Sequence, residues 1–308
     1  MTSPNGLLFL PPPNTADPIL SPNSDDWWNY DTLTSLPGTI LSPRLLDTAQ
    51  RSDGMHVMYL HGRTSDPQVG SKIGAAVSQD GEAWGRVEGA DSSGACVVAA
   101  TDGGFVAHPA VLFVEDPAAA KPNGQLRGMF KMLYVEGDLP EGEGSRGTGV
   151  KVALSEDGFE WTRSGREVLP LAGSGLKSVG RLTVERTRVF DEGKEEWRDG
   201  EGFTMFFDGE DGDGRVGIYE AATGTAMAED DGWIIKEKPA LAPAEEGSGS
   251  FDEAAVRSPA IVRLESGEER LYYTGVAASG EESLGVATRR GEGEWERVNV
   301  GGLRVLGE

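Results

Sequence analysis

The sequence predicts an all-β protein, a β-propeller with four complete four-stranded blades and a fifth blade that is incomplete or missing. Three observations lead to this fold class. A turn motif recurs along the chain, each recurrence is preceded by several short apolar runs, and no amphipathic pattern extends beyond about two helical turns.

The recurring motif is a turn that combines Asp-Gly with a following Trp. It reads Ser-Gln-Asp-Gly-Glu-Ala-Trp at 78–84 and Ser-Glu-Asp-Gly-Phe-Glu-Trp at 155–161, with weaker copies at 228–233 and 288–295. Asp-Gly between two extended runs is a strong hairpin signal, because Gly and Asp tolerate the positive φ of a tight turn. Four copies define a repeat of roughly 60 to 80 residues, which is typical of stacked β-units.

Each repeat contains four short runs with Gly, Asp or Pro between them. The expected blades span about 33–89, 104–165, 178–238 and 255–300, within one domain of residues 1–308. The N-terminal segment 1–32, through its apolar run 7–10, and the C-terminal run 303–306 are expected to contribute to an incomplete closing blade. An open propeller would expose an unpaired sheet edge, which favours oligomerisation. A pair of β-sandwiches is the competing fold, but it gives no reason for the fourfold repeat.

Composition excludes several classes of partner. The formal net charge of −23 disfavours binding to nucleic acid or to an anionic membrane surface. The single Cys excludes an internal disulfide and favours an intracellular compartment. Residues 1–20 lack the basic start of a signal peptide, and no apolar run reaches the roughly 18 residues of a membrane helix. We therefore expect a soluble protein.

No metal ion or cofactor is expected. Three His and one Cys are too few for a zinc site to be favoured. The acidic stretch 208–214 resembles a calcium-binding loop, but Tyr219 occupies the place of the bidentate Glu that such a loop requires. An exposed hairpin tip explains the stretch better.

The repeats resemble a known group of enzymes. The order Ser-Pro-Ala-Ile-Val at 258–262, Leu-Tyr-Tyr-Thr-Gly at 271–275, Gly-Val-Ala-Thr at 285–288 and Trp-Glu-Arg at 295–297 resembles the blades of the five-bladed glycoside hydrolase superfamily. This group comprises arabinanase, levansucrase and invertase relatives in glycoside hydrolase families 32, 43, 62 and 68. The resemblance extends from about residue 33 to 300, but it concerns residues that set architecture. The Asp-Gly-Trp turn also resembles the Asp box of six-bladed sialidases.

The resemblance implies a site at the mouth of a central channel, where two carboxyl groups flank the scissile bond. Asp31 is then the candidate base, with Asp252 or Glu253 as the supporting carboxylate or acid. The invertase-type Asn-Asp-Pro-Asn and the Arg-Asp-Pro motif are absent. Two alternatives stay open: these acids cap turns or pair with Arg181 and Arg257, or the site lies elsewhere, for instance at Asp208 or Glu136.

Basic residues suggest a ligand pocket. His108, Arg181 and Arg257 are expected at equivalent places at the start of three inner strands, and His61 and Arg63 follow the first blade's second strand. Such donors would bind an anion or sugar hydroxyl groups. Tyr30, with Trp27 and Trp28, is a candidate stacking platform for a sugar ring. Two functions follow: a propeller that binds or hydrolyses a saccharide, or a non-catalytic binding or scaffold module that has lost its catalytic carboxylates.

Overall fold

A computed structural model describes residues 18–26, 28–42, 54–66, 68–101, 103–116, 127–138, 146–224, 232–291 and 293–298. These residues form sixteen β-strands and contain no helix, so the all-β prediction is confirmed. No helix among them is long and apolar enough to cross a membrane. The two terminal runs that were expected to form a closing blade, 7–10 and 303–306, lie outside the described residues.

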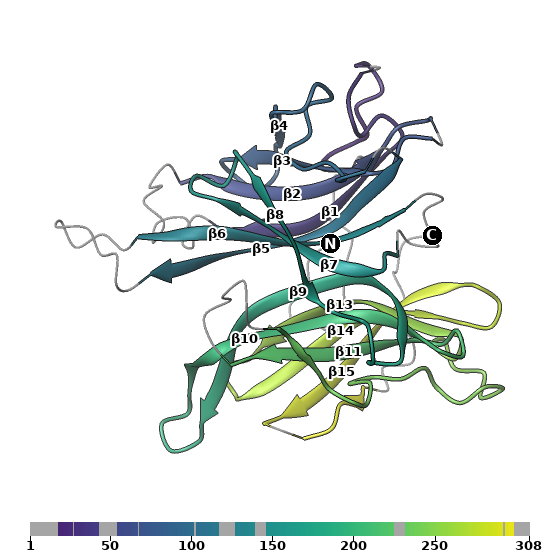
Figure 1. Ribbon diagram of the computed structural model, residues 1–308. Helices are drawn as coiled ribbons and strands as arrows, with labels where there is room; N and C mark the ends of the chain where they lie inside the picture. The colour runs from purple at the N-terminus through teal and green to yellow at the C-terminus, as the bar shows by residue number, and fades with distance from the viewer. Residues whose placement is uncertain are drawn as a thin grey trace. The chain divides into compact units, whose positions relative to one another are not determined.

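The strands form four antiparallel blades, each in sequence order (Figure 1). The first blade comprises β1 (Thr34–Leu41), β2 (His56–Arg63), β3 (Lys72–Ser78) and β4 (Gly85–Val87). The second comprises β5 (Gly104–Asp116), β6 (Arg127–Asp138), β7 (Gly149–Ser155) and β8 (Thr162–Leu169). The third comprises β9 (Leu176–Asp191), β10 (Glu196–Asp211), β11 (Val216–Thr223) and β12 (Ile234–Ile235). The fourth comprises β13 (Ala255–Arg263), β14 (Glu268–Val276), β15 (Glu282–Arg290) and β16 (Glu296–Arg297).

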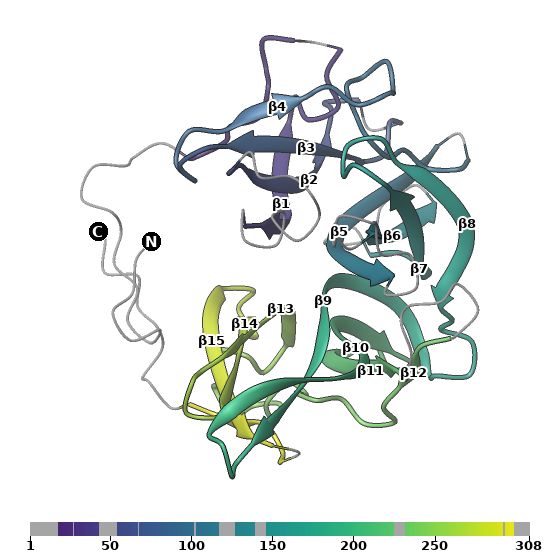
Figure 2. The same cartoon turned by 90° about the vertical axis from the view of Figure 1, so that its left-hand side faces the viewer.

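The chain divides into two compact units, one holding β1 to β8 and the other β9 to β16. In the second unit, a single parallel pair, Val216 with Ala255, links β11 to β13. Figure 2 shows β13, β14 and β15 of the fourth blade next to one another. The linkers between blades pair in a similar way within each unit. Val97 bridges Ile73 on β3, and Leu241 bridges Ile218 on β11. Each linker is therefore held against the third strand of the blade that it leaves.

The recurring turn has the same hydrogen bonds in the first two blades. In the second, one oxygen of Asp157 accepts bonds from the backbone N–H groups of Phe159 and Glu160, at 2.8 and 2.9 Å. Trp161 donates its indole N–H to the carbonyl of Gly158 at 3.1 Å, and Gly158 has a φ of 81°. The Ser, Asp, Gly and Trp of the motif thus close one turn, which explains their fixed spacing. Most of the copy at 228–233 lies outside the described residues.

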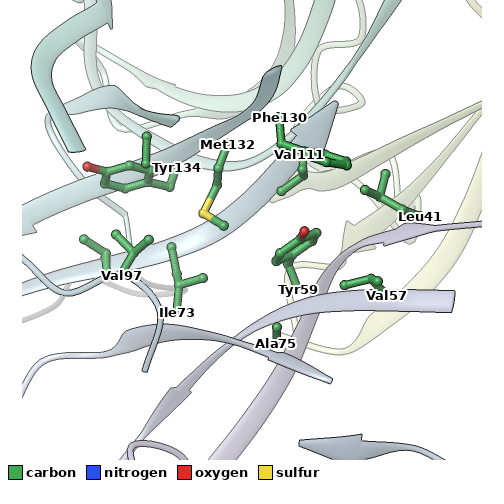
Figure 3. Packing of buried hydrophobic residues seen from close by; sticks show 12 residues of the cluster. Leu41, Val57, Tyr59, Ile73, Ala75, Val97, Val111, Phe130, Met132 and Tyr134 are labelled. Carbon is green, nitrogen blue, oxygen red and sulfur yellow. The ribbon is translucent and has the colours of Figure 1, made fainter. Parts of the chain in front are cut away.

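The core of the first unit lies between its two blades (Figure 3). Tyr59 of β2 is 1% exposed, and the edge of its ring meets the ring of Trp161 at 5.6 Å. Its hydroxyl donates to the carbonyl of Gly158 at 2.8 Å. The Trp of one blade therefore packs against the second strand of the preceding blade, as a propeller requires.

The second unit has an equivalent core and an ionic network. Phe206 of β10 meets Trp295 edge to face at 6.0 Å. The Arg289 guanidinium lies 4.4 Å from the Trp295 ring, and it pairs with Glu220 and Glu269 at 3.1 and 2.5 Å. These contacts join the third blade to the fourth, because Glu220 lies on β11 and the other charged partners lie on β14 and β15.

Candidate functional site

Every blade has a β-bulge in its innermost strand. At each bulge two residues of the first strand lie opposite a single residue of the second strand. The two-residue bulges and their opposing residues are Gly38-Thr39 with Tyr59, His108-Pro109 with Tyr134, Gly180-Arg181 with Asp208, and Ser258-Pro259 with Tyr273. A bulge re-aims side chains locally, so these positions are candidates for ligand contacts.

The registers correct one expectation about the basic residues. His108 is the first residue of its bulge, Arg181 is the second residue of its bulge, and Arg257 directly precedes a bulge. The prediction that the three occupy equivalent positions is therefore wrong. The residue equivalent to His108 in the fourth blade is Ser258, and both have a φ of 54°. A left-handed backbone at two non-glycine residues costs about 1–3 kcal/mol each and often marks a functional position.

The third blade departs from the others at its bulge. The other three blades place a buried Tyr opposite the bulge, whereas the third places Asp208, which is 3% exposed. Its Oδ2 accepts hydrogen bonds from the backbone N–H groups of Arg181 at 3.1 Å and of Ser258 at 3.0 Å. One carboxylate oxygen therefore joins the bulges of the third and fourth blades. Asp208 was predicted only as an alternative site residue, although the Asp in place of Tyr is visible in the sequence.

Asp208 also affects the pKa of its neighbour Arg181. Burial lowers the pKa of the Arg181 guanidinium, and the Asp208 carboxylate counteracts that shift. Arg257 precedes Ser258 in the chain, so its backbone lies at the same junction. The second unit therefore gathers Arg181, Asp208 and Arg257 at one place, which we call the bulge junction.

The two His predicted to bind a ligand contact one another in the first unit. The rings of His61 and His108 lie 4.6 Å apart at an angle of 71°. The His108 backbone N–H donates to Nδ1 of His61 at 3.3 Å. His61 is 2% exposed and His108 is 8% exposed, so both are buried. His61 was expected after the first blade's second strand and His108 at the start of an inner strand. His61 lies within β2, and His108 lies within β5.

Asp31, the candidate base, is fully buried in an ion pair. Arg86 of β4 donates to it from Nε at 3.0 and 3.2 Å and from a terminal nitrogen at 2.6 Å. The same terminal nitrogen also donates to the carbonyl of Ser21 at 2.5 Å. The side chain of Asp31 is 0% exposed and that of Arg86 is 22% exposed. These contacts fix the loop before β1 to the outer strand of its own blade.

Asp252, the second candidate, has a matching environment in the fourth blade. Arg297 donates to its Oδ2 at 2.7 Å, and Tyr273 donates to the same oxygen at 2.9 Å. Burial would raise the pKa of Asp252, but hydrogen bonds from Ser250, Arg297 and Tyr273 hold it below its usual value. Arg297 also donates to the carbonyl of Ala242 at 2.5 Å.

Glu253 and Glu136 are likewise engaged in local contacts. Glu253 accepts a hydrogen bond from the backbone N–H of Gly249 at 2.9 Å, which closes the loop before β13. Glu136 accepts from Arg163 at 2.6 Å and from the backbone N–H of Ala100 at 2.8 Å.

The three Arg residues that bind Asp31, Glu136 and Asp252 share one position in their blades. Each follows the Trp of its blade by two residues, and each lies opposite an Ala of the third strand. The pairs are Arg86 with Ala76, Arg163 with Ala153, and Arg297 with Ala287. In the third blade the equivalent residue is Ile235, opposite Ala221. The Trp-x-Arg pattern was visible in the sequence, but its partners lie up to 65 residues away.

Of the described residues in the candidate stacking platform, Tyr30 is buried and Trp28 is exposed. Tyr30 is 2% exposed and packs in a core cluster with Leu60 and Ala76. Its hydroxyl lies where a Cβ at Gly74 would be only 2.0 Å away. Trp28 is 39% exposed, and Trp27 lies outside the described residues. In the described part of the chain, no group of three or more His, Cys, Asp or Glu could hold a metal ion.

Solved structures with a similar fold are glycoside hydrolases. One belongs to the GH130 family of mannoside phosphorylases, which contains glycoside hydrolases that target β-1,2 mannosidic linkages in Candida mannan. Its TM-score is 0.57, and its identity is 15% over 93% of this chain and 78% of the other. This chain has the fold of the glycoside hydrolase propellers. A putative glycosidase from Bacteroides thetaiotaomicron matches with a TM-score of 0.57 and 16% identity over 93% of this chain and 80% of the other.

A third glycoside hydrolase propeller, an α-L-arabinofuranosidase from Podospora anserina in complex with cellotriose, matches with a TM-score of 0.52. Its identity is 12%, over 95% of this chain and 77% of the other. No protein-family model and no curated protein sequence matches the chain. The predicted resemblance is thus confirmed at the level of the fold.

Proposed function

We propose that this propeller binds a saccharide at the bulge junction of its third and fourth blades and does not hydrolyse it. The observation that carries the proposal is the distribution of carboxylates. Among the twelve residues that form the four bulge sites, all of them described, Asp208 is the only carboxylic acid. A glycosidase needs two carboxyl groups about 5 to 9.5 Å apart across the scissile bond.

The other candidate carboxylates support a binding role. Asp31 and Asp252 are 0% exposed and each is held by an Arg of the outermost strand. A carboxylate that is buried and bonded in this way is a poor proton donor or nucleophile, because it would have to break its ion pair to react. We therefore assign both to anchoring the loops before the inner strands. Glu253, which closes a loop, has the same kind of role.

The basic groups of the junction support saccharide binding. Arg181 presents a planar fork of N–H donors, which suits sugar hydroxyl or carboxylate groups. Asp208 supplies an acceptor, so the junction offers both donors and an acceptor to hydroxyl groups. The similar structures were solved with, or named for, saccharide targets, among them cellotriose and β-1,2 mannosidic linkages. Anionic or hydroxylated sugars are thus the proposed ligand class.

The test combines binding and turnover. Calorimetry with manno-, arabino- and cello-oligosaccharides should give saturable binding to at least one of them, and Arg181→Gln should weaken it about tenfold. Arg188→Gln is the matched control, because it removes the same charge from the other end of β9. Aryl β-mannosides and α-arabinofuranosides should not be turned over. Turnover that Asp31→Asn or Asp252→Asn abolishes would overturn the non-catalytic assignment. Absence of saturable binding would overturn the proposal that the bulge junction binds a saccharide.

A further inference from the structure

A cavity of about 690 Å³ opens at the end of the β10–β11 hairpin in the second unit. Its walls come from the hairpin turn, the loop 239–246 and the start of the fourth blade. The volume lies within the range of about 300 to 1,000 Å³ that small-molecule sites occupy. None of the bulge junction residues lines it, so it is distinct from the proposed saccharide site.

The floor of the cavity contains a Tyr whose ring is fixed. Tyr219 is 8% exposed, and its ring stacks on Phe207 at 5.9 Å with 24° between the planes. Gly209 and Gly217 are partners in the ladder beneath it. A Cβ at Gly209 would lie 2.9 Å from the Tyr219 ring, so a glycine is required there for the ring to lie flat. Gly209 therefore leaves the space in which the Tyr219 ring lies.

The hydroxyl of Tyr219 has no hydrogen-bond partner among the described residues, although the side chain is more than nine-tenths buried and lines the cavity. The hydroxyl oxygen itself is not a fully buried atom, so it reaches the open space of the cavity and can donate a hydrogen bond to a bound group. Burial and the nearby Asp211 carboxylate raise the pKa of Tyr219, so the hydroxyl keeps its proton at neutral pH. A bound polar group would satisfy it.

The rim of the cavity is acidic. Asp211, Glu245, Glu246 and Glu253 line it with one cation, Arg215. Glu245 and Glu246 are exposed, and within the described chain neither has an ion-pair partner. One oxygen of Asp211 accepts the N–H groups of the hairpin turn, and one oxygen of Glu253 accepts that of Gly249. These bonds fix two of the four carboxylates in place without neutralising them.

We propose that this cavity binds an organic amine, with its ammonium groups at the acidic rim and a polar group on the Tyr219 hydroxyl. An ammonium ion is attracted by several carboxylates at once, and an aromatic ring beside it adds to that attraction. Both an aliphatic polyamine and an amino sugar carry this chemistry. An anion or a neutral sugar would gain nothing from the rim.

Calorimetry on the full chain tests the inference, with spermidine, the disaccharide of glucosamine and neutral cellobiose as probes. One or both amines should bind saturably at about 50 mM salt and several-fold more weakly at about 300 mM, because the rim acts through screened charges. The tighter amine identifies the source of the ligand. Neutral cellobiose should not bind in this cavity, so any binding heat that it gives should be the same in the parent and in every variant of the cavity.

Tyr219→Phe keeps the stacked ring and removes only the hydroxyl, so it should weaken amine binding about tenfold. Glu245→Gln with Glu246→Gln should weaken it further, whereas Glu192→Gln with Glu195→Gln, at the opposite end of β10, should leave it unchanged. Thermal unfolding of each variant checks that it is folded. No saturable amine binding, or binding that Tyr219→Phe and the Glu245/Glu246 pair leave unchanged, would overturn the proposal. Neither outcome bears on the saccharide site.

Discussion

Arg86 holds the fully buried carboxylate of Asp31 through Nε and a terminal nitrogen, the shorter contact being 2.6 Å. Arg297 likewise pairs with the buried carboxylate of Asp252, through Nε at 2.7 Å. Removing one partner of such a pair leaves an uncompensated buried charge, which costs more than the pair itself contributes. The consequences are measurable.

The first prediction concerns Arg86→Met. It leaves Asp31 buried without its cation, and we expect the free energy of unfolding to fall by about 3–5 kcal/mol in urea titrations. The double variant Arg86→Met with Asp31→Asn should recover part of this loss, because the buried charge is gone. Equal losses in the single and double variants would contradict the ion-pair explanation.

The second prediction concerns pH and Asp252. Its pKa is held below the usual value in the folded protein by hydrogen bonds and the Arg297 charge, which outweigh burial. The resulting stabilisation is present above the unfolded-state pKa of about 3.9 and is lost as the pH falls through the lower folded-state pKa. Asp252→Asn should therefore be less stable than the parent at pH 7, and the difference should shrink below about pH 4. Thermal melts across this range measure it; a constant difference would argue against the assignment.

The third prediction compares two glycines of the repeated turn. Gly81 and Gly158 have φ values of 79° and 81°, but a Cβ at Gly81 meets nothing within 4 Å, whereas one at Gly158 would lie 3.0 Å from the Tyr59 hydroxyl. Gly81→Ala should cost about 1 kcal/mol from the backbone alone. Gly158→Ala should cost more. Tyr59→Phe alone should also destabilise the protein, because it removes the hydrogen bond to the Gly158 carbonyl, but Gly158→Ala with Tyr59→Phe should cost less than the sum of the two single changes. Chemical denaturation of the parent and these variants decides the order.

The fourth prediction concerns Tyr30→Phe. The Tyr30 hydroxyl is buried, and the described residues offer it no hydrogen-bond partner. Removing an unsatisfied buried hydroxyl removes its desolvation penalty, so Tyr30→Phe should leave stability unchanged or raise it by about 1 kcal/mol. Tyr273→Phe is the control, because its hydroxyl donates to Asp252 and its loss should destabilise the protein. A destabilised Tyr30→Phe would show that the hydroxyl has a partner.

The fold could be predicted because its determinants are local. Ser, Asp, Gly and Trp close each turn within seven residues, so Trp84 and Trp161 marked their blades without any structure. Strand order followed from the repetition of that unit. The all-β architecture and the four blades are thus properties of short sequence windows.

The site could be predicted less well because its contacts are long-range. Asp31 was predicted as a base, with turn capping or pairing with Arg181 or Arg257 as the alternative. The Arg86 that binds it follows 55 residues later in the chain. The bulges also shift the register by one residue, and no sequence signal reveals where. As a result Arg257 appeared equivalent to His108, a place that Ser258 occupies. The Asp208 contact with Ser258 crosses between blades and was equally invisible.

The Arg of the Trp-x-Arg pattern links the outermost strand of a blade to the loop that leads into the same blade. Arg86, Arg163 and Arg297 sit on or within the outermost strands, yet each holds a backbone carbonyl of the preceding linker. Detaching the outer strand therefore also releases the entry loop, so these three blades should come apart by peeling from the periphery. In the third blade Ile235 stands in place of the Arg, so its outer strand lacks this side-chain bond to the linker.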